Sequence, residues 1–254
     1  MNAIVQEASD EAREIELRSD EFWAAVDEVL SWVPGPLGPL IEPIRAGMAE
    51  LGRKMQEFWD RVGKLFEQPG NADRLKQVGE QWATLVGDIC NDIAGTITLD
   101  KMRTNIEWQG PAAESYKAQV PPQSEGLTTV KDIAGQVRTS LDNLANSIDS
   151  FWLAVKFALA GFAIAIVGAI AAACTVVGIP AAIGVIVAAV AAALGLVTAA
   201  VMALESHVNT IENEQTAIRQ RVTDLADGWT MTDTAALSDA SATDGDPSDW
   251  RPTR

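Results

Sequence analysis

The sequence is poor in the residues on which most enzymes depend. It contains one histidine, His207, and two cysteines, Cys90 and Cys174. None of them has neighbours at metal-ligand spacing, two cysteines make no disulfide framework, and glycine motifs for nucleotide binding are missing. We therefore predict no catalytic, cofactor-binding or metal-binding residues, and we expect a protein that is not an enzyme.

Positive charge is also scarce. The chain carries 19 Lys and Arg against 35 Asp and Glu, a net charge of −16. Such a surface repels phosphate backbones, so nucleic acid is not an expected partner. The first residues include Glu7 and Asp10 and lack the basic and apolar regions of a Sec signal. We expect a secreted or cell-envelope, membrane-associated protein that uses a Sec-independent route, with a cytoplasmic location as the alternative.

Strand-type alternation of apolar and polar residues is missing too, whereas helical spacing recurs along the chain. The sequence predicts an all-α fold of long antiparallel helical hairpins in a coiled-coil bundle, with an apolar helical-hairpin tip. Composition and breaker residues divide it into four expected parts: an N-terminal helical hairpin (1–69), a helix–turn–helix (70–125), a long stalk with the apolar hairpin (126–229) and a disordered acidic tail (230–254).

Several residues predict where helices begin, end or pair. Pro43 suits the first turn of the second helix, and the third helix is expected to continue to about Trp108. Pro121 and Pro122 are expected to kink or interrupt the chain, because proline cannot donate a backbone hydrogen bond. Gln215 is the one polar residue in the apolar seam that follows the hairpin, and such a residue often fixes helix register.

No charged residue occurs between Lys156 and Glu205. Residues 157–179 and 181–204 are each long enough to cross a hydrocarbon core of about 30 Å, with a turn at Gly178-Ile179-Pro180. Small residues recur four apart in both halves, which allows close helix packing in a bilayer. The predicted membrane hairpin is marked by Phe157, Gly161, Ala165, Ala169, Ala173, Pro180, Gly184, Ala188, Ala192 and Leu204.

A helix that is apolar on all sides can also be the buried core of a soluble protein. In that alternative the hairpin is covered in an oligomer, by a partner or by the chain's own helices. The helix of residues 43–66 is a candidate cover for the stalk, but its charges predict a poor cover for the tip.

Trp108-Gln109-Gly110 lies between two predicted helices, and Pro111 to Tyr116 follow on a short helix. In this setting, residues 70–150 resemble the WXG100 (ESAT-6-like) superfamily of type VII secretion substrates. The resemblance places the family's turn at Trp108 and Gly110, with Tyr116 as the aromatic that often follows. It implies a secreted, dimer-forming helical protein exported by the type VII secretion machinery. The family's export signal, Tyr-x-x-x-Asp/Glu, is not matched, because Val120 stands four residues after Tyr116.

Two hypotheses follow from these features. The first is a non-enzymatic WXG100-like protein that inserts into or associates with a lipid bilayer through residues 157–204, with pore formation by an oligomer as one outcome. Its two-helix stalk with an apolar head is similar in architecture to α-helical pore-forming toxins of the haemolysin E type. The second is a soluble adaptor or chaperone-like module for a secreted toxin. Its apolar hairpin would be buried by a helical partner or by self-association.

Overall fold

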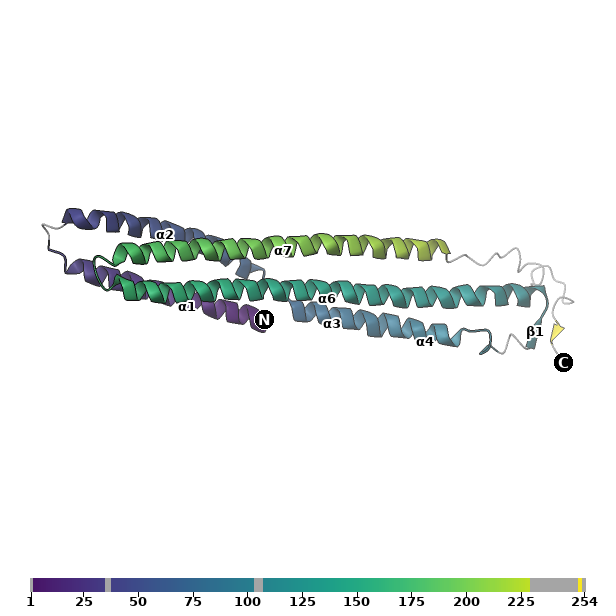
Figure 1. Ribbon diagram of the computed structural model, residues 1–254. Coiled ribbons are helices and arrows are strands. Elements are labelled where there is room, and N and C mark those ends of the chain that lie inside the picture. The colour runs from purple at the N-terminus through teal and green to yellow at the C-terminus, as the bar shows by residue number, and fades with distance from the viewer. Residues whose placement is uncertain (1, 35–37, 103–106, 229–250, 253–254) are drawn as a thin grey trace. The chain divides into compact units, whose positions relative to one another are not determined.

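The computed structural model describes residues 2–34, 38–102, 107–228 and 251–252, and these are almost entirely helical (Figure 1). The expected all-α fold is therefore confirmed. The helices are α1 (Ala3–Ser31), α2 (Gly38–Glu67), α3 (Ala72–Trp82), the π-helical η2 (Ala83–Asp88), α4 (Ile89–Thr96), α6 (Pro111–Ala173) and α7 (Ile179–Gly228). Two strands of two residues each, β1 (Trp108–Gln109) and β2 (Arg251–Pro252), pair antiparallel.

The chain divides into two compact units, and each takes a part of α6 and α7. Unit 1 consists of Met1–Asp73 and Leu144–Asn209, and unit 2 of Arg74–Asn143 and Thr210–Arg254. The tail predicted to be disordered, 230–254, lies outside the described residues except for 251–252.

Unit 1 is a bundle of α1, α2 and the adjoining halves of α6 and α7 (Figure 1). The apolar stripe of α2 enters one core that is shared by all four segments. Glu7 of α1 pairs with Lys156 of α6 at 2.9 Å, and the Trp152 indole donates to the carbonyl of Pro69 at 2.7 Å. The start of α1 and the end of α2 therefore lie at the same end of the bundle.

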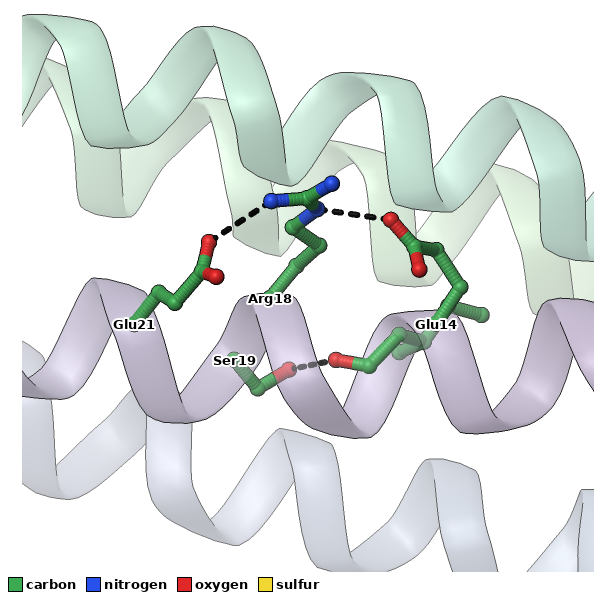
Figure 2. Close-up of polar contacts among 5 residues, drawn as sticks. Glu14, Arg18, Ser19 and Glu21 are labelled. Carbon is green, nitrogen blue, oxygen red and sulfur yellow. Dashed lines mark hydrogen bonds and ion pairs between the residues drawn. The ribbon is translucent and has the colours of Figure 1, made fainter.

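The outward face of α1 is charged. The guanidinium of Arg18 donates to Glu14 at 2.7 Å and to Glu21 at 2.9 Å, and Ser19 donates to the backbone of its own helix (Figure 2). The hydrogen bonds to Glu21 and Glu14 raise the pKa of Arg18 above its ordinary value. This side of α1 thus remains charged and hydrated while the opposite side is buried.

Unit 2 contains an antiparallel pair formed by α3–η2–α4 and the first half of α6. Glycines at the contact allow close approach, since an added Cβ at Gly79 would lie 3.3 Å from Arg138 and one at Gly87 would lie 3.4 Å from Ala134. Further along, Ser124 donates to the carbonyl of Ala94 at 3.0 Å. Residues 72–96 are therefore held along α6.

The register of α7 in unit 2 is fixed by a different residue from the one predicted. Gln215 is exposed. Its neighbour Glu214 accepts hydrogen bonds from Ser140 and, at 3.3 Å, from Asn143 of α6. The prediction placed the polar contact at Gln215, inside the apolar seam. In the structure, the carboxylate of Glu214 beside the seam accepts from two donors and remains in contact with water.

Two expectations about proline were wrong. Pro121 and Pro122 lie inside α6, which runs without interruption from Pro111 to Ala173. Each removes one backbone hydrogen bond, but Val120 beside them is buried and the contacts of unit 2 hold the helix on both sides. Pro43 is likewise inside α2, which begins at Gly38 rather than at the proline.

Two helix ends also differ from the sequence prediction. The helix expected to reach about Trp108 ends at Thr96, after which the backbone of Ile97 leaves helical geometry. In the apolar hairpin, α6 ends at Ala173 and α7 begins at Ile179, so Pro180 belongs to the first turn of α7. The turn itself is residues 174–178.

Gly178 is required by this turn, because a Cβ at this position would clash with the carbonyl oxygen of Ala172. We expect Gly178→Ala to lower the free energy of unfolding by about 1–3 kcal/mol. Gly184→Ala is the matched control, since a Cβ there would meet no other described part of the chain within 4 Å. It should be neutral or stabilising by up to about 1 kcal/mol through helix propensity. Urea denaturation of both variants measures the difference, and equal stability would contradict the role of Gly178.

Candidate functional site

The charge-free stretch 157–204 forms the hairpin predicted from the sequence, with its two arms in α6 and α7 of unit 1. Both helices are long and apolar enough to cross a membrane by length and composition. A core helix of a soluble protein passes the same test but is mostly buried. In the most apolar stretches of α6 and α7 only 39% and 28% of the residues are buried. These helices are therefore less covered than ordinary core helices.

One face of the hairpin packs against α1 and α2. Phe58 of α2 meets Phe162 of α6 edge to face, with ring centroids 5.0 Å apart. Closer to the turn, the space beside Gly47 of α2 is filled by Ile183 of α7. The buried members of this interface share one core: Val5, Ala8, Ile15, Phe22 and Val26 of α1, Ile41, Ile44, Leu51, Met55, Phe58 and Val62 of α2, and residues of α6 and α7 from Phe151 to Ala200.

The second helix therefore covers one face of the tip, although its charges predicted a poor cover. Ile41 and Ile44 are 6% and 4% exposed and belong to the same core as the start of α7. The charges of α2 near the tip do not interfere, because Glu42 and Arg45 pair with each other on the outer surface. Amphipathic periodicity, rather than the number of charges, decides what a helix can cover.

The opposite face of the hairpin is exposed and carries no charge. Ile164 of α6 is 73% exposed and Leu196 of α7 is 56% exposed. The other large apolar side chains exposed on this face and at the turn are Phe157, Val167, Val176, Val177, Val185 and Met202. Apolar surface of this extent on a soluble protein marks a site of protein or membrane interaction. We call these eight residues the outer apolar face.

The predicted small-residue stripes are divided between the two faces. Ala169 and Ala173 are buried and Ala165 is partly buried. The remaining members of the stripes, Gly161, Gly184, Ala188 and Ala192, are exposed, as is Pro180, while Leu204 is partly buried. The glycines at 161 and 184 meet no other described part of the chain within 4 Å of an added Cβ. Most of the stripe on α7 is therefore unused by the packing of the described chain.

All three polar side chains of the hairpin have partners within the hairpin. Cys174 donates to the carbonyl of Ile170 at 3.5 Å, and Thr198 donates to that of Leu194 at 2.7 Å. The hydroxyl of Thr175 accepts from the backbone of Gly178 at 3.1 Å. Polar groups must be satisfied internally in hydrocarbon, so these contacts make the hairpin compatible with lipid.

The Trp-x-Gly residues lie directly before α6. Trp108 belongs to β1, Gly110 has a positive φ of 116°, and Pro111 starts the helix as predicted. Tyr116 is on α6 and 36% exposed. Because α4 ends at Thr96 and α6 begins at Pro111, Gly110 directly precedes α6 but does not directly follow α4.

Comparison with protein-family models, with curated protein sequences and with solved structures gave no match to the chain. Among the described residues, no group of three or more His, Cys, Asp or Glu is placed to hold a metal ion. The structural features that stand out are therefore the outer apolar face and the two helices that cover the inner one.

The covering contact predicts how easily the hairpin is uncovered. Phe58→Ala removes a fully buried ring and should cost about 3–5 kcal/mol of the free energy of unfolding. It should also increase binding of the dye ANS, because α2 then leaves the hairpin more often. Leu17→Ala on the exposed side of α1 is the control and should change stability by less than about 0.5 kcal/mol. Unchanged stability and ANS binding in the Phe58 variant would contradict this account of the cover.

Proposed function

We propose that the protein is a non-enzymatic, membrane-inserting helical protein whose hairpin 157–204 enters a lipid bilayer. The observation that carries the proposal is the outer apolar face, on which Ile164 and Leu196 are exposed in a segment without charge. Either half of the hairpin is favoured in hydrocarbon by about 3–6 kcal/mol from its ten Ile, Leu, Val and Phe residues. Each of its three polar side chains makes a hydrogen bond within the hairpin.

Insertion requires α1 and α2 to leave the hairpin. Their outer surfaces carry ion pairs such as Arg18 with Glu14 and Glu21, and these groups are strongly disfavoured in hydrocarbon. The charges that bound the hairpin, Lys156 and Glu205, mark where it would meet water again. The inner core surface released from α1 and α2 then becomes available to lipid or to other hairpins. Self-association through the small residues of α7 would be the route to an oligomer or a pore.

Export by a type VII secretion system is the proposed route to the membrane. It is supported by the antiparallel pair in unit 2 and by Gly110, whose positive φ of 116° precedes α6. Because Val120 stands where the export signal has an acid, a helical partner is proposed to supply that signal.

The export proposal predicts a dependence on the secretion machinery. In a bacterium that carries a type VII system, the protein should accumulate in the medium or envelope, and loss of the system's ATPase should retain it in the cell. Gly110→Val should reduce export, since a β-branched residue is strained at this φ. Export that is unaffected by loss of the ATPase would overturn the proposed route without bearing on membrane insertion.

A soluble adaptor is the second candidate, and the close cover by α1 and α2 favours it. In this function the outer apolar face is buried by a helical partner or a second copy. An adaptor would not bind to lipid vesicles in the absence of its protein partner, whereas a membrane-inserting protein would.

Flotation with phosphatidylcholine vesicles tests the proposal. The wild-type protein should float and resist extraction with alkaline carbonate. The double variant Ile164→Asp and Leu196→Asp should fold normally, because both positions are exposed, yet lose carbonate resistance. One aspartate near the middle of each arm costs about 2.5–3.5 kcal/mol in a bilayer, which offsets much of the roughly 3–6 kcal/mol by which that arm is favoured.

Leu17→Asp is the matched control, because Leu17 is 61% exposed but lies on α1. It should float like wild type. A wild-type protein that stays at the bottom of the gradient as a discrete oligomer would overturn insertion and favour the adaptor.

A further inference from the structure

A cavity of about 620 Å³ lies at the end of unit 1, where α1 ends and α6 turns into α7. We call it the tip cavity; it is lined by Glu28, Val29, Trp32, Val33, Pro34, Ile41, Cys174, Thr175 and Val176. We propose that it binds one hydrocarbon chain of a lipid whose headgroup is uncharged or zwitterionic. Its volume is within the range of about 300–1,000 Å³ typical of small-molecule sites.

The tip cavity brings residues 29–34 and Ile41 together with the charge-free hairpin 157–204. The sequence carries no charge between Glu28 and Glu42 either. Ile41 at the cavity is 6% exposed and belongs to the core, whereas Trp32 is 80% exposed. The site therefore runs from the buried core out to an exposed aromatic side chain.

The charge at the cavity selects among hydrocarbon ligands. Among the described residues of the lining, Glu28 is the one that carries a charge, and none is Lys or Arg. A ligand with an anionic head would face a carboxylate without a compensating cation, which is unfavourable. A chain with a neutral or zwitterionic head avoids this repulsion and keeps the apolar contact with Val29, Val33 and Val176.

The polar groups of the lining do not suit a peptide. A bound backbone needs a partner for each N–H and C=O that it buries. The side chains of the lining offer Glu28, the indole N–H of Trp32, Cys174 and Thr175, and the last two already contact the hairpin backbone. At the end of α1 the carbonyls of Val29 and Leu30 already accept from residues 32 and 33. A hydrocarbon chain has no polar groups that need hydrogen-bond partners.

The inference rests on the proposed function, because a bilayer would supply the lipid whose hydrocarbon chain is bound. It adds a ligand at the end of the hairpin. Val177 is 89% exposed beside the cavity, and Trp residues favour the water–membrane interface. When the tip meets a bilayer surface, a lipid chain can therefore enter the cavity before the hairpin crosses.

Cys174 provides the measurement, since it is exposed and lines the cavity. In full-length protein carrying Cys90→Ser, the rate of alkylation of Cys174 by N-ethylmaleimide is followed with lysophosphatidylcholine below its micellar concentration. At ten times its Kd the probe should fill about 90% of the sites and slow alkylation about tenfold. A fatty acid anion of the same chain length should protect less. Glu28→Gln should raise its protection towards that of lysophosphatidylcholine.

Two neighbouring substitutions separate the cavity from the surface around it. Val176→Trp places a large ring in the cavity and should abolish protection. Val177→Trp adds the same ring at a more exposed residue outside the lining and should leave protection intact. Thermal unfolding of both variants checks that they fold. If the Val176→Trp variant does not fold, the effect of Glu28→Gln on protection by the fatty acid anion still tests the proposal.

Three results would overturn the inference. They are no protection of wild type, protection that survives Val176→Trp in a folded protein, and protection without lipid that increases with protein concentration. The last would place a second copy of the chain on the tip. None of these results bears on flotation, so failure of the cavity and failure of membrane insertion are distinguished.

Discussion

The structure depends on the way a hairpin that is apolar on all sides meets two helices that are apolar on one side only. α1 and α2 each have an apolar stripe, and both stripes are consumed by the inner face of the hairpin. If α1 or α2 also covered the outer face of the hairpin, charged groups such as Arg18 with Glu14 and Glu21 would have to be buried. The outer face, with Ile164 and Leu196, therefore remains exposed in the described chain.

This division gives one segment two compatible environments. In the bundle the hairpin uses its large side chains on one side, for example Phe162 against Phe58. In a bilayer the same hairpin would need no further polar partner, because Cys174, Thr175 and Thr198 already bond within it. The cover and the bilayer compete for the same inner surface, so the stability of the α1–α2 contact would set how readily the hairpin is released.

Fold class could be predicted because helical periodicity and the lack of charge in 157–204 are local properties of the sequence. The positions of helix ends were less predictable. Pro121 and Pro122 were expected to kink or interrupt the chain, but α6 continues through them, with Val120 buried before them and Ser124 bonded to Ala94 after them. Similarly, Glu214 rather than Gln215 pairs across the stalk, since Glu214 faces α6 while Gln215 is exposed to solvent.

The sequence by itself determined the all-α fold, the charge-free hairpin and the breaker residues around Gly178, because each depends on neighbours a few positions apart. Only the tertiary structure decided which side of the hairpin is covered and by which helices. The charges of the helix of 43–66 predicted a poor cover for the tip, yet Ile44 is buried there while Glu42 and Arg45 pair outside. The same packing brings residues 29–34 and Ile41 to the hairpin turn and creates the tip cavity. Such pairings depend on how stripes from distant segments meet, and periodicity within one helix does not specify its partner.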